Sequence, residues 1–264
     1  MVSVLPIILF NLIAAIAIMV VAWILSLLKK DASIADIFWG LGFVLIAWLT
    51  FIKTNGYLPR SLLITALTTL WGMRLAIHIC VRDWGKGEDR RYQAWRENYG
   101  PRFWWVSLFT VFGLQASLLW VISLVVQVGQ ISTVPAKFVL LDGVGALVWT
   151  VGFFFETLGD WQLLRFKADS ANKGKVMNRG LWAYTRHPNY FGESLMWWGI
   201  FFIALATPGS LWVIISPVVI TFLLLKVSGV ALLEKSIVET RPKYKDYINS
   251  TNAFIPWLRK KGKL

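Results

Sequence analysis

Long apolar runs dominate the chain, and its polar positions gather between them. Residues 103–136 and residues 194–225 contain no Asp, Glu, Lys or Arg. An uncharged apolar run of about 20 residues is long enough to cross a bilayer. The second run is too long for one helix, and Thr207–Ser210 divides it with a tight turn. The pattern predicts seven membrane-spanning helices, at residues 4–28, 34–52, 61–81, 103–128, 138–163, 188–206 and 210–233.

The composition agrees with an all-α integral membrane protein. Of the 264 residues, 57% are hydrophobic and only 16% are charged, whereas a soluble domain carries about 25% charged residues. No repeat, low-complexity tract or soluble domain interrupts the pattern, so we expect residues 1–264 to form a single membrane domain. One Cys and two His residues are too few for a typical zinc site, so no metal is predicted.

The basic residues predict the orientation of the helices. With seven crossings, 22 of the 27 Lys and Arg residues fall on one side of the membrane and three on the other. Basic residues favour the cytoplasmic side, so the N-terminus is expected outside and the C-terminus in the cytoplasm. This asymmetry accounts for most of the net charge of +13 without a nucleic-acid partner. The remaining charge would attract membrane lipids or a phosphate-bearing cofactor.

Several polar residues lie inside the predicted helices, mostly toward the cytoplasmic ends. Ionisable residues within membrane helices are costly and are candidates for function. Clustering at one depth indicates a polar cavity open to the cytoplasm, and the alternative is a set of interhelical ion pairs, such as Arg74 with Asp36 or Lys226 with Glu156. The set comprises Asp36, Arg74, His78, Glu156, Asp160, Asn189, Glu193, Lys226 and Glu234.

Two basic loops with interspersed aromatic residues, 82–102 and 165–190, face the same side. Arg and Lys bind phosphate, and aromatic rings stack on planar bases. The loops therefore suit a nucleotide, although an ordinary juxtamembrane loop has the same character. Neither loop contains a Rossmann or Walker motif, so a nucleotide would need a different kind of site.

The run from Gly180 to Glu193, GLWAYTRHPNYFGE, resembles the signature of the steroid 5-alpha-reductase superfamily, in the bacterial branch formerly described as a domain of unknown function (DUF1295-like). Residues 71–74, residues 85–89 and residues 254–258 resemble further segments of that branch. The signature-bearing part covers about residues 138–264. The resemblance implies a multi-pass protein of the bacterial inner membrane.

The resemblance also implies a seven-helix bundle that binds NADPH and reduces a carbon–carbon double bond conjugated to a carbonyl in a sterol-like or other lipid. Asn189 and Glu193 would contact the nicotinamide end, and Asp160, Lys167 and Tyr184 match further family positions. Together with the polar residues beside them, the expected cofactor-binding set is Glu156, Asp160, Lys167, Lys175, Arg179, Tyr184, Arg186, His187, Asn189, Tyr190, Glu193 and Glu234.

The chain departs from the animal steroid reductases where those enzymes hold the substrate ketone. The N-terminal half lacks their Gln-Glu pair, and Trp71 or His78 stands near the position of their Tyr. Their C-terminal His and Tyr fall near Val230 and Glu234. The resemblance therefore supports the cofactor more strongly than a steroid substrate. We expect His78 or Asp36 to be the catalytic acid that polarises the carbonyl, Asp36 only if burial keeps it protonated.

Two other functions share these features. Arg186-His187-Pro188 with Tyr190, and Glu234, also resemble S-adenosylmethionine-dependent lipid methyltransferases of the isoprenylcysteine carboxyl type. A non-catalytic lipid-binding or transport protein is the third class, but transporters place their sites near the midplane. All three functions predict a lipid-like small molecule as partner. None of them predicts the oligomeric state.

Overall fold

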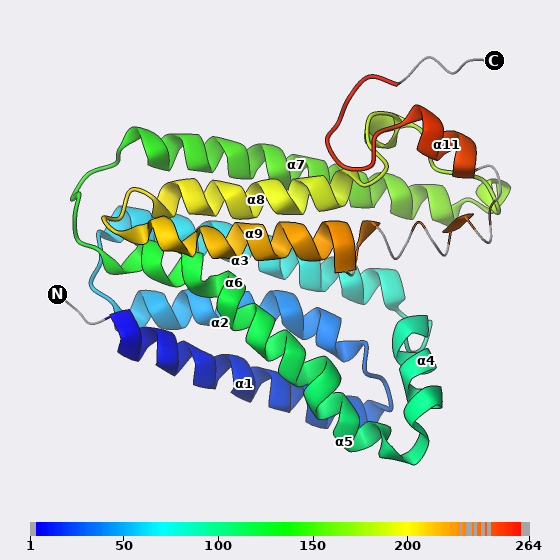
Figure 1. The fold of residues 1–264 in the computed structure, drawn as a ribbon, viewed down its shortest axis with the longest axis horizontal. Helices are drawn as coiled ribbons and strands as arrows, with labels where there is room; N and C mark the ends of the chain where they lie inside the picture. Colours follow the sequence, from blue (N-terminus) through cyan, green and yellow to red (C-terminus); the bar gives the residue numbers. More distant parts are fainter. Residues whose placement is uncertain are drawn as a thin grey trace. The chain divides into compact units, whose positions relative to one another are not determined.

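The structure, a computed structural model, describes residues 4–227, 229–230, 234, 237–238, 241 and 244–259, and all regular secondary structure in these ranges is helical. The principal helices are α1 (Val4–Lys29), α2 (Ile34–Lys53), α3 (Leu58–Asp83), α4 (Arg90–Tyr99), α5 (Phe103–Ser107), α6 (Leu114–Ile131), α7 (Leu140–Ala168), α8 (Pro188–Ala204), α9 (Ile215–Phe222) and α11 (Tyr244–Ser250), as Figure 1 shows.

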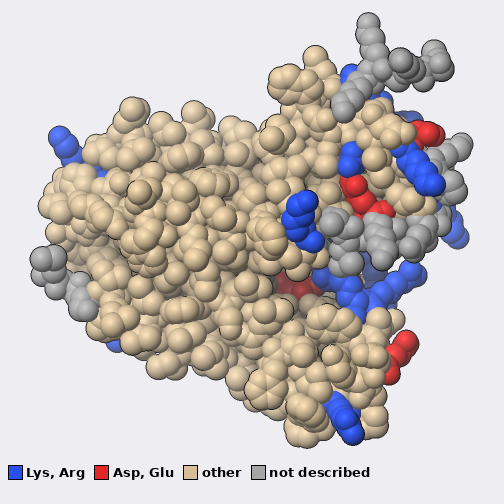
Figure 2. Space-filling view, in the orientation of Figure 1, with Lys and Arg blue, Asp and Glu red and all other residues tan. Residues whose placement is uncertain are grey.

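Six helical segments within the described residues are long and apolar enough to cross a membrane. They confirm a helical, multi-pass membrane protein, and in Figure 2 much of the visible surface carries no charged side chain. The segment expected to be the remaining span, residues 188–206, is α8, which has 17 residues. The count of seven and the orientation of the termini stay predictions. The six segments are α1, α2, α3, Arg90–Ile131, α7 and Ser210–Val227.

The turn predicted at Thr207–Ser210 is confirmed, with Gly209 at a φ of +75°. Two short helices were not predicted, α4 in the basic loop 82–102 and α11 near the C-terminus. Both are too short and too polar to produce the apolar runs from which the spans were recognised. A π-helical turn at Leu108–Gly113 joins α5 to α6, so the expected helix from residue 103 is one interrupted helix.

The chain groups into two compact units. Unit 1 contains Met1–Gly143 and Phe201–Ser216, and unit 2 contains Val144–Ile200 and Pro217–Leu264. The single domain expected from the sequence stays a prediction. In unit 1, α1, α2, α3 and α6 pack on one another. Gly40 of α2 and Gly72 of α3 face each other so closely that a Cβ on either would lie 2.6 Å from the carbonyl oxygen of the other.

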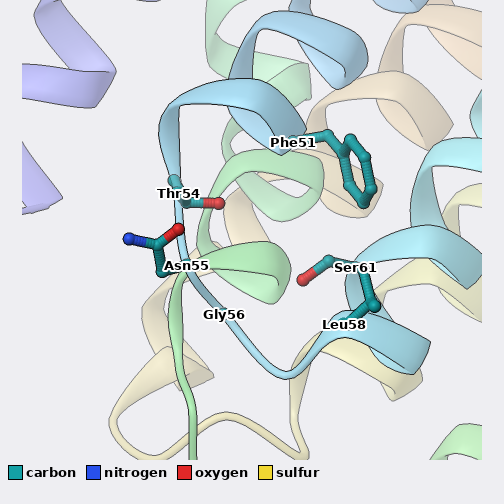
Figure 3. Close-up of a pocket in the computed structure, with 6 residues that line it drawn as sticks. All are labelled: Phe51, Thr54, Asn55, Gly56, Leu58 and Ser61. Atoms are coloured by element: carbon teal, nitrogen blue, oxygen red, sulfur yellow. The ribbon is translucent and has the colours of Figure 1, made fainter.

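Buried polar side chains also join the helices of unit 1. Asn11 of α1 donates to Thr50 of α2 at 2.8 Å and to Gln127 of α6 at 3.0 Å. All three side chains are fully buried. Such hydrogen bonds between helices are typical of membrane bundles, where apolar side chains alone give little specificity. A pocket of about 230 Å³ at the α2–α3 connection has an uncharged lining, with Thr54 and Ser61 among its residues (Figure 3).

A buried ion pair closes the same end of unit 1. Arg60 Nε lies 2.7 Å from Asp142 Oδ1, and both side chains are almost completely buried. Asp142 also accepts a hydrogen bond from the backbone of Val139, and Arg60 donates to the carbonyl of Lys137. The pair therefore fixes the α6–α7 connection to the first turn of α3.

Candidate functional site

Glycines bring α7 and α8 of unit 2 into backbone contact. A Cβ on Gly152 would lie 2.5 Å from the carbonyl oxygen of Gly192, and a Cβ on Gly199 would lie 2.7 Å from that of Gly145. A Cβ on Gly159 would lie 3.2 Å from the backbone nitrogen of Asn189, at the start of α8. The glycines are seven apart on each helix, at 145, 152 and 159 and at 192 and 199, which keeps them on one seam. This spacing is a sequence signal for close packing of the two helices, and the motif analysis missed it.

The close packing places the polar residues of the two helices together. Asn189 Nδ2 donates to Asp160 Oδ1 at 3.0 Å, which links the first turn of α8 to α7. Asp160, Glu156 and Glu193 are all buried. The structure therefore joins Asn189 and Asp160 directly, and Glu156 lies against the seam, since a Cβ on Gly192 would meet its backbone nitrogen at 2.4 Å.

The second heteroatom of Asn189 could accept a hydrogen bond from a ligand or from a water molecule. Asn189 Oδ1 is buried and has no hydrogen-bond partner among the described residues. A buried polar atom without a partner costs about 1–3 kcal/mol, so such an atom at a functional site calls for a ligand or a water molecule. As an acceptor, Oδ1 suits the N–H group of a carboxamide.

Arg186, His187 and Glu234 form a second cluster. Arg186 Nε and Nη2 bind the two oxygens of Glu234 at 2.6 and 3.0 Å, and His187 Nε2 lies 3.0 Å from Glu234 Oε1. Arg186 Nη1 donates to the carbonyls of Ile248 and Thr251. Burial acts to raise the pKa of the Glu234 carboxyl, but His187 and Arg186 outweigh it and hold the pKa below its ordinary value.

This cluster ties the signature run to the C-terminal segment. The backbone N–H of Arg186 donates to the carbonyl of Asn252 at 2.9 Å, and that of Trp257 donates to the carbonyl of Tyr184 at 3.0 Å. Tyr247 on α11 donates to the carbonyl of Trp182. Four of the five N–H donors of Arg186 are thus in use within the protein, an arrangement that holds the start of α8 in place. Its expected contact with the cofactor stays a prediction.

The end of α7 carries a basic pocket of about 230 Å³. Lys167 and Lys173 are exposed on its wall, and Gly174 turns the chain there with a φ of +78°. Arg241 reaches the pocket from the C-terminal segment and donates to the carbonyl of Lys175 at 2.8 Å. The sequence analysis did not propose Lys173 or Arg241 as site residues. Arg241 could not be found in that way, because only the fold brings it to this loop. The lining consists of Phe166, Lys167, Asp169, Ser170, Asn172, Lys173, Gly174 and Arg241.

The other expected cofactor residues lie around these clusters. Lys175, Arg179 and Tyr184 are exposed, and Tyr190 is half-buried with its ring stacked on that of His187 at 5.5 Å. Within the described part of the chain, no group of three or more His, Cys, Asp or Glu residues is arranged to hold a metal ion.

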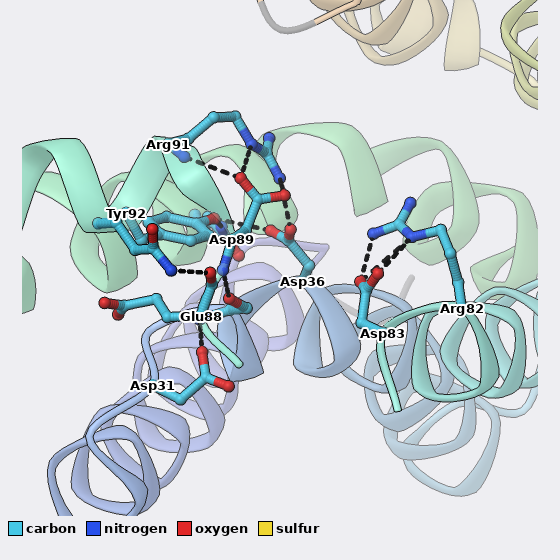
Figure 4. Close-up of polar contacts among 11 residues, drawn as sticks. Asp31, Asp36, Arg82, Asp83, Glu88, Asp89, Arg91 and Tyr92 are labelled. Atoms are coloured by element: carbon cyan, nitrogen blue, oxygen red, sulfur yellow. Dashed lines mark hydrogen bonds and ion pairs between the residues drawn. The ribbon is translucent and has the colours of Figure 1, made fainter. Parts of the chain in front are cut away.

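The two expected catalytic residues belong to unit 1. Asp36, in the first turn of α2, accepts hydrogen bonds on both oxygens, from Arg91 at 2.8 Å and from Tyr92 at 2.7 Å (Figure 4). This ion pair gives Asp36 a structural partner in α4. His78 is half-buried near the end of α3. The catalytic roles of both residues stay predictions.

Comparison with known proteins gives one match. A family model described as "Protein of unknown function (DUF1295)" matches residues 22–251, which include every candidate residue named above. Comparisons with curated proteins and with solved structures found no match. Because the model covers most of the 264 residues, the chain belongs to the DUF1295 family of proteins.

Proposed function

We propose that this protein is a membrane-embedded, NADPH-dependent reductase of a carbon–carbon double bond conjugated to a carbonyl in a lipid-like substrate. The proposal rests on the hydrogen bond between Asn189 and Asp160. It leaves the buried Oδ1 atom of Asn189 without a hydrogen-bond partner among the described residues. The resemblance of the signature run to steroid 5-alpha-reductases names the same Asn as a nicotinamide ligand.

The residues present fit the two ends of NADPH. Asn189 Oδ1 would accept from the carboxamide N–H, while Asp160 holds the amide group in that orientation. The basic pocket at the end of α7 suits phosphate, because Lys167 and Lys173 provide positive charge in a turn of exposed backbone. NADPH, when bound, supplies a hydride to the β-carbon of the substrate.

The residues of the chain would position the cofactor and supply a proton. Glu156 and Glu193, which are buried on the two contacting helices, would fix the face of the ring. A catalytic acid must donate to the carbonyl oxygen as negative charge develops on it. His78 is the first acid to test, because both oxygens of Asp36 already accept hydrogen bonds.

The membrane arrangement belongs to the same proposal. With 17 residues, α8 spans about 25 Å, which is close to the hydrocarbon thickness of a bilayer. We therefore count it as the seventh span, with the N-terminus outside and the C-terminus in the cytoplasm of a bacterial inner membrane. The residues for the nicotinamide end and those for the phosphate end of the cofactor would then both face the cytoplasm, which supplies NADPH.

A methyltransferase that uses S-adenosylmethionine is the second candidate. The contact of Arg186 and His187 with Glu234 favours it, since these residues also carry the likeness to the isoprenylcysteine carboxyl type. A lipid-binding or transport protein without a cofactor is the remaining reading.

Cofactor binding separates the three functions. Purified protein in neutral detergent is titrated with NADPH and, separately, with S-adenosylmethionine, and binding is followed by equilibrium dialysis. We expect NADPH to bind, and Asn189→Ala to weaken it by about 0.5–1.5 kcal/mol, the net contribution of one hydrogen bond. The control is Asn98→Ala, at an exposed position on α4. Binding of S-adenosylmethionine alone, or of neither compound, would overturn the proposal.

A further inference from the structure

Two hydrogen bonds attach the start of the signature run to one turn of α7. The Oε1 atom of Gln162 accepts the backbone N–H of Leu181 at 3.0 Å. The buried indole of Trp182 donates from Nε1 to the carbonyl oxygen of Gly159, also at 3.0 Å. Because Gly159 and Gln162 are three residues apart on α7, they lie on the same side of the helix.

The same turn of α7 carries Asp160, the hydrogen-bond partner of Asn189. Since a Cβ on Gly159 would meet the backbone nitrogen of Asn189, this turn contacts both the start of the run and the first turn of α8. The contacts of Gln162 and Gly159 therefore set how the run packs on α7. They also set where Asn189 meets Asp160.

The glycine at which the run begins is packed against the Gln162 side chain. Gly180 has a φ of +58°, in the left-handed region that favours glycine. A Cβ there would lie 2.5 Å from Nε2 and 2.6 Å from Oε1 of Gln162. A side chain at residue 180 would therefore push this amide away from the N–H of Leu181.

We propose that Gln162 and Trp182 are positioning residues, which act through Asn189 to hold the nicotinamide end of NADPH. This role rests on the proposed function. Each of the two side chains fixes the run to α7, so that Asn189 presents its Oδ1 atom in one orientation. Loss of either hydrogen bond lets the run separate from α7, which weakens the contact with the carboxamide. The basic pocket at the end of α7 keeps its residues and continues to bind phosphate.

The test compares the affinity of the full chain in neutral detergent for NADPH and for 2′-phospho-ADP-ribose, which lacks the nicotinamide. Gln162→Met keeps the length of the side chain and removes the acceptor, and Trp182→Phe removes the indole donor. Gln162→Glu restores an acceptor at the same place. The control is Gln93→Met on α4, which also removes a hydrogen bond between a glutamine and the backbone, the one to the carbonyl of Glu88. Melting curves verify that each variant folds, and Trp182→Phe carries the same test if Gln162→Met does not.

In Gln162→Met and in Trp182→Phe, the affinity for NADPH should fall by about 2- to 10-fold, which corresponds to one hydrogen bond. The affinity for 2′-phospho-ADP-ribose should stay at the wild-type value. Gln162→Glu should recover NADPH binding, and Gln93→Met should leave both affinities unchanged. In an Asn189→Ala background, Gln162→Met should cause no further loss, because both changes then remove the same contact.

Trypsin reports the attachment of the run without any cofactor. Cleavage after Arg179 requires residues 180–183 to leave α7, whereas Lys173 is exposed earlier in the same loop and serves as an internal reference. The ratio of the first cleavage rate to the second should rise by about 2- to 10-fold in Gln162→Met, since the population of the open run limits cleavage after Arg179.

Three binding results would overturn the positioning role: equal losses of both ligands in Gln162→Met, an unchanged affinity for NADPH, or a further loss in the Asn189→Ala background. An unchanged cleavage ratio would show that Gln162 does not hold the run on α7, and would overturn the role as well. Failure of the wild-type protein to bind NADPH would instead overturn the proposed function, and the positioning role with it.

Discussion

Adding a single methyl group at Gly192 tests whether backbone contact between α7 and α8 sets the candidate site. A Cβ at this position would lie 2.4 Å from both the carbonyl oxygen of Gly152 and the backbone nitrogen of Glu156. Both atoms belong to the backbone of α7, so no side-chain rotation relieves the overlap. In Gly192→Ala, the two helices must therefore move apart.

The size of the movement follows from the contact distances. Ordinary contact begins near 3.4 Å, so the helices must separate locally by about 1 Å. Overpacking of this kind costs about 1–3 kcal/mol of folding free energy. Because Asn189 lies one turn away on α8, the same shift would move it relative to Asp160. A misplacement of about 1 Å in a positioning group can slow a reaction by about 100-fold.

The matched control is Gly143→Ala on α7, the helix that Gly192 of α8 contacts. A Cβ at Gly143 meets nothing within 4 Å, and replacing a helical glycine with alanine stabilises a helix by about 0.5–1 kcal/mol. Melting temperature in detergent and single-turnover oxidation of NADPH are measured for both variants. We expect Gly192→Ala to lose stability and rate, and Gly143→Ala to retain both.

Three results would contradict this reasoning. If Gly192→Ala melts at the wild-type temperature, the backbone contact does not limit the packing of α7 on α8. If it is destabilised but keeps the wild-type rate and NADPH affinity, the helix seam does not position the cofactor residues. If Gly143→Ala loses as much stability as Gly192→Ala, the loss does not come from the backbone contact at Gly192.

Three further predictions concern other parts of the chain. Asp142→Asn should destabilise the protein by about 3–5 kcal/mol, because it leaves Arg60 charged and buried, whereas the double variant Arg60→Met/Asp142→Leu should melt closer to wild type. Because the folded protein holds the pKa of Glu234 below its ordinary value of 4.5, the stability from this group is complete above that pH and is lost as the pH falls through the lowered pKa; Glu234→Gln should flatten this part of a melting-temperature profile. Reporter fusions at Gly209 and Leu264 should report opposite compartments, and a shared compartment would refute the seven-span arrangement.

Local properties of the sequence were enough to predict most helices. The apolar runs predicted α1, α2 and α3 within three residues of their observed bounds, because the length of a span is set by the thickness of a bilayer. The turn at Thr207–Ser210 and the family of the chain also followed from short stretches of sequence. Within the site, the spacing of Asn189 and Glu193 on one helix was readable, since it depends only on the helical repeat.

The partners of the charged side chains were decided only by the tertiary structure. Asp36 binds Arg91 and Tyr92 of α4, which the sequence analysis did not name as its partners. Arg186 binds Glu234, 48 residues away in the sequence. Hydrophobic periodicity shows which segments become helices, but the rotation of each helix and its neighbour depend on contacts between distant residues. The glycine seam between α7 and α8 provides such contacts, and it places Asn189 against Asp160.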